Sequence, residues 1–203
     1  MTRIKEKFTA LESQNQKALI AYIMVGFPNE KATISTVRGL VKGGVDIIEL
    51  GFPFSDPLAD GPVIQNASTI SLQKGANIAK FFSLVKKIRK ETDVPIVLMT
   101  YTNILYNKGY AKFIAEATKA GIDGFILPDM SIEESKDYLL AAKSKADTIF
   151  LISPNTSKTR ISKISKATSG FLYLVAVYGT TGVKIGIKKY TIDAIKQVKK
   201  QTK

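Results

Sequence analysis

Hydrophobic residues occur along this chain in short continuous runs, and amphipathic segments separate one run from the next. The first run, residues 18–25, is followed by Gly26 and Pro28, and its unbroken apolarity is typical of a strand buried on both faces of a parallel sheet. On the same grounds we predict strands at residues 18–25, 46–50, 95–100, 123–127, 148–152 and 171–175.

Between the runs, apolar residues recur at helical spacing, as Ile4, Phe8 and Leu11 do near the N-terminus. We predict helices at residues 3–14, 30–42, 78–90, 110–120, 132–144, 159–167 and 190–200. Strand, helix and strand in this order form βαβ units, whose crossovers are right-handed. Gly44 and Gly121 lie between a helix and the next strand, where glycine can serve as the C-cap that ends the helix.

The alternation predicts an α/β protein with one domain over residues 1–203, because no linker or low-complexity segment interrupts it. We expect a (β/α)8 TIM barrel, which usually needs about 250 residues, with about six βα units present. The sequence ends at Lys203, where the strand after the last helix should begin, so we expect strands seven and eight to be missing at the C-terminus. An open doubly wound sheet is the alternative, but Gly26-Phe27-Pro28 is not its glycine-rich nucleotide-binding turn.

Cysteine and histidine are both absent from the sequence. Disulfides, thiolate nucleophiles, Cys/His zinc sites and Ser-His-Asp triads are therefore excluded. Acid–base chemistry is left to carboxylates, lysine or tyrosine. No apolar run is long enough to cross a bilayer, and charged residues follow Met1, so we expect a cytoplasmic protein without a membrane partner.

The net charge of +13 raises the possibility of a nucleic-acid-binding protein. The lysines, however, are spread over the charged faces of successive helices, for example at residues 86–90 and 196–200, and no nucleic-acid-binding motif accompanies them. We favour a lysine-rich solvated surface and expect no nucleic-acid partner. Salt-dependent binding to DNA in a gel-shift assay would reverse this interpretation.

Candidate chemistry follows the second predicted strand. Glu49 ends an otherwise apolar strand, where a carboxyl group is either a functional acid with a raised pKa or a strand-end residue bonded to nearby backbone or facing solvent. Residues 51–65 form a long loop that contains Asp56 and Asp60, and long loops in compact domains are usually functional. Aspartate before glycine or proline often only makes a turn. Nevertheless, Glu49 and Asp60 can converge above one barrel as an acid–base pair.

The run of residues 49–62, Glu-Leu-Gly-Phe-Pro-Phe-Ser-Asp-Pro-Leu-Ala-Asp-Gly-Pro, resembles the signature of the tryptophan synthase α chain family. The similarity continues through residues 99–103, 127–129 and 173–182, in order and over nearly the whole chain. The resemblance implies a (β/α)8 barrel and a carbon–carbon lyase of tryptophan biosynthesis. Its reaction is the retro-aldol cleavage of indole-3-glycerol phosphate to indole and glyceraldehyde 3-phosphate.

The resemblance assigns catalytic roles to Glu49 and Asp60. Glu49 would protonate the indole carbon that carries the side chain and take the proton of the glycerol hydroxyl group. Asp60 would accept a hydrogen bond from the indole N–H and stabilise the developing positive charge. A protonated indole is itself an electron sink, so the cleavage needs neither a metal nor a cofactor.

The resemblance also implies a substrate pocket and a partner. The residues that match the indole pocket are Tyr22, Met99, Tyr101, Ile126, Leu151 and Tyr173, and each could equally be barrel core. Thr181 and Gly182 match the mobile loop that closes over the substrate, with the threonine meeting Asp60. Asp56 and Pro57 match a loop that contacts a β subunit, which receives the indole, carries pyridoxal phosphate and completes an α2β2 heterotetramer.

Two departures from the family pattern affect what the resemblance implies. Ala176-Val177-Tyr178 stands where the family commonly has Ser-Arg before the closing loop. The family holds the substrate phosphate with loops after strands seven and eight, which this sequence does not contain. An alternative function is therefore a non-catalytic α-like chain that binds and activates a β subunit. The retention of Glu49 and Asp60 argues for the enzyme, although we expect these 203 residues alone to be inactive.

Overall fold

A computed structural model describes residues 1–175 and 189–202 of the chain. The strands are β1 (Ile20–Met24), β2 (Ile47–Gly51), β3 (Ile96–Met99), β4 (Gly124–Ile126), β5 (Asp147–Ile149), β6 (Leu151–Ile152) and β7 (Tyr173–Leu174). The helices are α1 (Arg3–Ser13), α2 (Glu30–Lys42), α3 (Pro62–Gln73), α4 (Ile78–Arg89), α5 (Thr102–Lys108), α6 (Tyr110–Ala120), α7 (Lys136–Ala142), α8 (Lys158–Ala167) and α9 (Lys189–Lys199).

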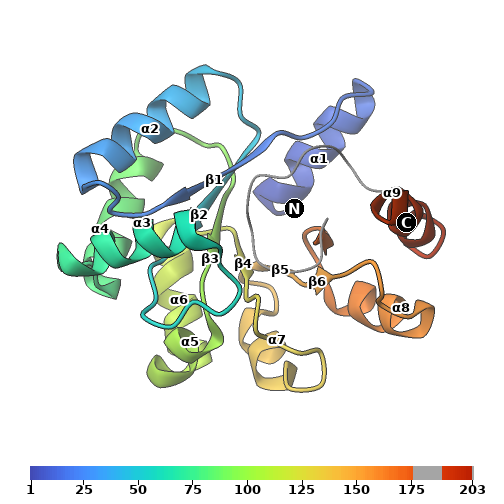
Figure 1. Cartoon of the computed structure of the whole chain (residues 1–203). Coiled ribbons are helices and arrows are strands. Elements are labelled where there is room, and N and C mark those ends of the chain that lie inside the picture. The colour runs from blue at the N-terminus through green and yellow to red at the C-terminus, as the bar shows by residue number, and fades with distance from the viewer. Residues whose placement is uncertain (176–188, 203) are drawn as a thin grey trace.

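The described strands form two parallel sheets, and in each the order in space follows the order in the sequence. In the described residues, β1 to β5 pair in succession, and β6 pairs in parallel with β7. Figure 1 shows the strands in the middle and the helices following one another around their outside. This is the arrangement of a (β/α) barrel, and β1 forms one edge of it because its described backbone pairs with β2 alone.

The sequence predicted each region of strand and most of the helices, but it failed in four places. The strand predicted at 148–152 is divided at Phe150, since β5 pairs with β4 and β6 pairs with β7. The long loop predicted at 51–65 ends earlier, because Pro62 occupies the first position of α3, where its missing N–H costs nothing. Helices α3 and α5 were not predicted, and α7 begins at Lys136 rather than near residue 132.

Local signals account for the helix ends. Side chains of Thr2, Asn29, Asn77 and Ser157 accept hydrogen bonds from backbone N–H groups in the first turns of α1, α2, α4 and α8. The predicted glycine C-cap is confirmed at Gly121, which ends α6 in the left-handed conformation with φ of 116°.

The sheet separates two hydrophobic cores. The larger core fills the space between the outer face of the strands and the surrounding helices, and it contains Phe81, Phe113 and Phe125. The smaller core lies on the inner face, and its buried members are Ile4, Ile47, Val97, Ile126 and Ile149. Ile4 comes from α1, so this helix closes the N-terminal end of the barrel, and the complete burial of that side chain stabilises the arrangement by about 1.5–3 kcal/mol.

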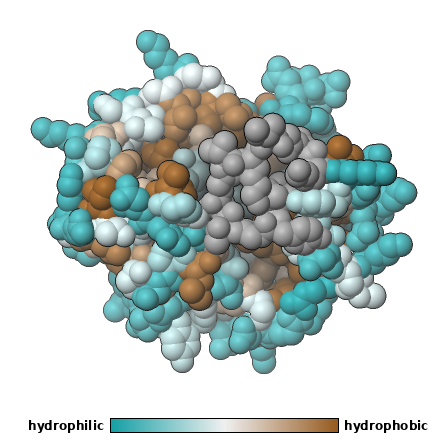
Figure 2. All heavy atoms as spheres, in the orientation of Figure 1, coloured by the Kyte–Doolittle hydropathy of each residue, from teal (hydrophilic) through white to brown (hydrophobic). Residues whose placement is uncertain are grey.

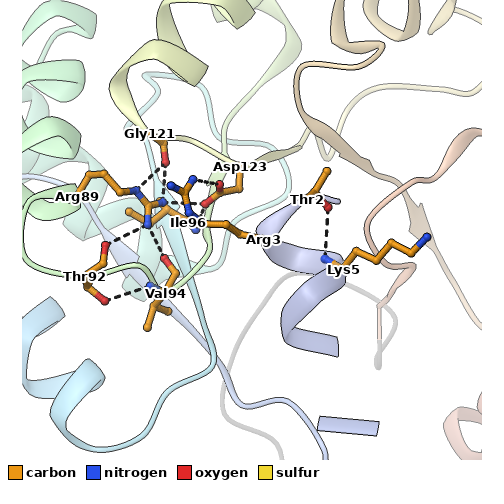
Figure 3. A network of polar contacts seen from close by, with 9 residues as sticks. All are labelled: Thr2, Arg3, Lys5, Arg89, Thr92, Val94, Ile96, Gly121 and Asp123. Carbon is orange, nitrogen blue, oxygen red and sulfur yellow. Dashed lines mark hydrogen bonds and ion pairs between the residues drawn. The ribbon is translucent and has the colours of Figure 1, made fainter. Parts of the chain in front are cut away.

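Ion pairs hold α1 in this position (Figure 3). The carboxylate of Asp123, just before β4, accepts from Arg3 of α1 at 2.9 Å and from Arg89 of α4 at 2.7 Å. Asp123 also accepts from the backbone N–H of Ile96, the first residue of β3, at 2.8 Å. The network therefore joins α1 to the starts of two strands, at the end of the barrel opposite to the ends of the strands where Glu49 lies.

The face of the molecule in Figure 2 carries hydrophilic residues along much of its outline, with hydrophobic patches between them. Among the described residues, no helix is both long and apolar enough to span a membrane.

Candidate active site

The inner face of the sheet brings the predicted pocket residues together. Tyr22 of β1 pairs in register with Glu49 of β2, Met99 of β3 pairs with Ile126 of β4, and Leu151 of β6 pairs with Tyr173 of β7. Paired positions of parallel strands point to the same face of the sheet. Met99, Leu151 and Tyr173 pack against the inner core, of which Ile126 is a buried member. These side chains therefore converge inside the barrel.

Glu49 is buried within this interior and is 3% exposed. Desolvation by burial raises the pKa of its carboxyl group from 4.5 to about 7. The carboxyl group forms no hydrogen bond or ion pair with any residue in 1–175 or 189–202. Burial without a partner among the described residues gives Glu49 a pKa at which a carboxyl group can both donate and accept a proton near neutral pH.

Two tyrosines lie beside Glu49. Burial raises the pKa of Tyr22 and of Tyr173, and the negative charge of Glu49 contributes to both increases. The charge of Asp60 also raises the pKa of Tyr22, so Tyr22 is a neighbour of both acids. Both phenols stay protonated near neutral pH and can serve as hydrogen-bond donors inside the site.

Gly51 makes the position of Tyr22 possible. A Cβ atom at residue 51 would lie 2.1 Å from the Tyr22 hydroxyl oxygen and 2.6 Å from the ring carbon that carries it. The phenol therefore crosses directly over the backbone of β2, two residues beyond Glu49, and only glycine leaves room for it.

Asp60 approaches the site from the loop between β2 and α3. Tyr101, which follows β3, donates a hydrogen bond from its hydroxyl group to Asp60 Oδ2 at 3.4 Å. The same hydroxyl oxygen accepts from the backbone N–H of Ala59 at 3.0 Å. Desolvation raises the pKa of Asp60, and the hydrogen bond from Tyr101 opposes that increase. Asp60 is thus half-buried and held by the hydroxyl group of Tyr101.

The loop between β2 and α3, which Tyr101 contacts at Ala59 and Asp60, is also held at Phe54. Ser68 of α3 accepts a hydrogen bond from the backbone N–H of Phe54 at 3.0 Å and donates one to the backbone carbonyl of Phe54 at 2.9 Å. The ring of Phe54 stacks on Tyr101, with 5.0 Å between the ring centroids and 28° between the planes. Sequence analysis missed Ser68, because it lies on a helix that the pattern did not reveal.

Asp56 and Pro57 lie apart from this buried region, at the exposed tip of the loop. Asp56 is exposed and accepts a hydrogen bond from the hydroxyl group of Ser55. Leu58, which follows Pro57, is 89% exposed although it is hydrophobic. Thr181 and Gly182, and with them Ala176-Val177-Tyr178, lie outside the described residues.

Two cavities border the site. One of about 620 Å³ lies beside Tyr22, between β1 and α3, and one of about 190 Å³ lies between the end of β1 and α4. Neither is lined by Glu49 or Asp60. Within residues 1–175 and 189–202, no group of three or more His, Cys, Asp or Glu side chains could hold a metal ion.

Comparison with known proteins identifies this arrangement. Residues 8–203 match the family described as "Tryptophan synthase alpha chain". The alpha chain of Methanosarcina acetivorans is 45% identical over 198 residues, covering 97% of this chain and 72% of that protein. The alpha chain of Synechococcus elongatus is 41% identical over 203 residues, covering 100% of this chain and 76% of that protein. The chain belongs to the tryptophan synthase alpha chain family.

Solved structures agree with this assignment. The tryptophan synthase alpha subunit of Legionella pneumophila superposes with a TM-score of 0.90 at 35% identity, over 100% of this chain and 76% of that one. A chain of the tryptophan synthase a2b2 complex of Pyrococcus furiosus superposes with a TM-score of 0.86 at 37% identity, over 92% of this chain and 75% of that one. The fold is therefore the TIM barrel of the tryptophan synthase alpha chains, as predicted, and the described part is a partial barrel.

Family membership settles the class of reaction. The chain is a carbon–carbon lyase of tryptophan biosynthesis that cleaves indole-3-glycerol phosphate to indole. The alpha chains of this family need no cofactor, since the pyridoxal phosphate of the complex is on the beta subunit. Homologues are alpha subunits of α2β2 complexes.

Proposed function

We propose that Glu49 and Asp60 carry the lyase reaction of this chain. The observation that supports the proposal best is a buried glutamate without a bonding partner in the described residues, whose pKa is raised to about 7 on the inner face of the barrel. General acid–base catalysis is most effective when the pKa of the group is close to the working pH. Asp60 is the second acid beside Tyr22.

In the proposed mechanism, neutral Glu49 protonates the indole carbon that carries the glycerol phosphate side chain. Asp60 accepts a hydrogen bond from the indole N–H and stabilises the resulting cation electrostatically. The Glu49 carboxylate then takes the proton of the glycerol hydroxyl group. The carbon–carbon bond breaks, its electron pair restores the indole ring, and glyceraldehyde 3-phosphate leaves as the aldehyde. Glu49 is protonated again at the end, so the cycle needs no further reactant.

The remaining site residues have supporting roles in the proposal. The walls of the indole pocket are formed by Tyr22, Met99, Tyr101, Ile126, Leu151 and Tyr173. The position of all but Tyr101 on the inner side of the barrel supports this assignment, and for Tyr101 its contact with Asp60 does. Thr181 and Gly182 close over the bound substrate. Residues 1–203 act as one domain, which we infer works in the cytoplasm.

The proposal extends to a partner. Asp56 and Pro57 contact a β subunit that binds pyridoxal phosphate and receives the indole. The exposure of Asp56 and of the neighbouring hydrophobic Leu58 supports this assignment, because an apolar side chain at a loop tip gains from burial in an interface.

Replacement of Glu49 tests the proposal. In a protein that also contains strands seven and eight of the family's barrel, Glu49→Gln preserves the shape of the side chain but removes its proton-transfer capacity, so turnover measured as indole release should fall by about 10²–10⁴-fold. Glu12→Gln, a change at an exposed glutamate of α1, is the matched control and should leave turnover unchanged. A Glu49→Gln protein with near-normal turnover would show that Glu49 is structural. It would leave activation of a β subunit as the function of the chain.

A further inference from the structure

The orientation of Asp60 depends on the position of Tyr101. Tyr101 is 7% exposed, and its hydroxyl group contacts both Ala59 and Asp60, at 3.0 and 3.4 Å. Its ring also stacks on Phe54 at the start of the same loop. Since the contact with Asp60 is long for a hydrogen bond between oxygen atoms, a small displacement of Tyr101 is enough to break it.

Both neighbours of Tyr101 in the chain are tied to β4 and the loop that follows it. The backbone N–H of Thr100 donates to the carbonyl of Ile126 at 3.1 Å. On the other side, the backbone N–H of Thr102 donates to the Asp129 carboxylate, at 2.9 Å to Oδ1 and 3.2 Å to Oδ2. The hydroxyl group of Thr102 donates to Asp129 Oδ1 at 2.9 Å. Tyr101 is therefore held between a backbone anchor and a side-chain anchor.

Asp129 supplies an acceptor that α5 lacks. Thr102 is the first residue of α5, and the cap residue Tyr101 makes no side-chain hydrogen bond to the first turn. The first N–H groups of a helix have no partner within the helix, so an acceptor from another segment fixes where the helix begins. Asp129 is exposed on the loop after β4, and it thereby aligns the end of β3 with the end of β4.

We propose that Asp129 is a positioning residue for Asp60, and that it acts through Thr102 and Tyr101. The inference rests on the proposed catalytic role of Asp60. Without Asp129, the segment after Tyr101 keeps its helix, because the freed N–H group faces water. The Tyr101 ring then has only Thr100 as an anchor to β4. Its hydroxyl group no longer holds Asp60 against the substrate, and Asp60 is misplaced during turnover.

Two variants at position 129 separate loss of the negative charge from loss of the hydrogen-bond acceptor. Asparagine at position 129 retains one acceptor, its amide oxygen. This oxygen can accept hydrogen bonds from both the N–H and the hydroxyl group of Thr102, as Asp129 Oδ1 does here. Ala at 129 retains no acceptor. We therefore expect Asp129→Asn to preserve the alignment of Tyr101 and Asp129→Ala to lose it.

The test uses a protein that also contains strands seven and eight of the family's barrel. It measures kcat and KM for indole release in Asp129→Ala, Asp129→Asn, Asp60→Asn and the double variant Asp129→Ala/Asp60→Asn. Asp129→Ala should lower kcat about tenfold to a hundredfold, as misplacement of a catalytic group does, with KM changed less than about twofold. Asp129→Asn should stay close to the parent protein. In the double variant, removal of Asp129 should have no further effect, because Asp60 no longer acts as an anion.

Asp137→Ala, at an exposed aspartate in the first turn of α7, is the matched control and should leave kcat unchanged. A second readout needs no turnover. The hydrogen bond from Tyr101 lowers the pKa of Asp60, so Asp129→Ala should raise that pKa in a carboxyl ¹³C NMR titration, in the same direction as Tyr101→Phe.

Three results would overturn the inference: a normal kcat in Asp129→Ala, equal losses in Asp129→Ala and Asp129→Asn, or multiplied losses in the double variant. The Asp60→Asn variant tests the proposed catalytic role of Asp60 independently of Asp129. If Asp60→Asn keeps normal turnover, the proposal that Asp60 is catalytic is wrong. If Asp60→Asn is impaired while Asp129→Ala is normal, only the positioning role of Asp129 is wrong.

Discussion

Glu49→Gln should make the protein more stable as well as less active, and the gain should depend on pH. Glu49 is almost completely buried, and its pKa rises from 4.5 to about 7 on folding. Folding therefore disfavours the charged form. A rise of about 2.5 pH units corresponds to about 3 kcal/mol of stability, at about 1.4 kcal/mol for each unit.

The direction in which stability changes with pH follows from proton binding to Glu49 in the folded and unfolded states. Between pH 4.5 and about 7 the folded protein holds a proton on Glu49 that the unfolded chain has lost, so the contribution of Glu49 to stability falls as the pH rises through this window. Below pH 4.5 Glu49 is protonated in both the folded and the unfolded protein. Above a pH of about 7 it is charged in both, and the full cost of burying that charge lowers the stability of the folded protein. Glutamine is neutral at every pH and carries no such penalty.

Urea unfolding of the parent protein and of Glu49→Gln at pH 4.5 and pH 8 measures the effect. We expect nearly equal free energies of unfolding at pH 4.5 and an advantage of about 3 kcal/mol for the glutamine variant at pH 8. Glu12→Gln, at an exposed position, should show no such difference between the two pH values. If the advantage of Glu49→Gln is the same at both pH values, or absent, Glu49 is not a buried group with a raised pKa.

Three further predictions concern the loop and the pocket. Asp60→Asn should lower turnover more than it weakens binding of an indole-propanol phosphate analogue, because a neutral amide cannot balance the cationic indole; equal losses in both assays would indicate uniform binding instead. Asp56→Lys should weaken association with a β subunit in calorimetric titration without changing the melting temperature, and unchanged affinity would remove this loop tip from the interface. Gly51→Ala should destabilise the protein by about 1–3 kcal/mol in thermal unfolding, because the new Cβ would lie 2.1 Å from the Tyr22 hydroxyl oxygen. Tyr22→Leu in the same chain should recover most of that loss, and an equally unstable double variant would contradict the proposed overlap.

Periodic patterns in the sequence were sufficient for the framework of the fold. Continuous apolar runs mark strands that are buried on both faces. β1, β3 and β4 lie within the runs that predicted them, and β2 extends one residue beyond its run, to Gly51. Gly121 marks a helix end because its left-handed conformation is a property of a single residue. The same local information failed for α3, whose mixture of polar and apolar residues resembles a loop until Pro62 is recognised as a first helical position.

The sequence also indicated which acids to consider, since Glu49 interrupts an apolar strand and Asp60 lies in the loop that follows. Its local pattern left open whether Glu49 is functional or structural, because the pKa of a carboxyl group depends on what covers it. Burial by residues from several strands raises that pKa to about 7, and no pattern around position 49 contains those residues.

The tertiary structure alone decided the contacts between loops. Tyr101 meets Asp60 across 41 positions of sequence, and Thr102 meets Asp129 across 27. Hydrophobic periodicity records the face of an element that is buried, but it holds no information on which loop lies beside another. That depends on the order and register of β2, β3 and β4, which place the carboxyl ends of successive parallel strands at one end of the barrel. The sequence thus determined the strands and the chemical groups available, and the packing of the strands determined which of those groups act together.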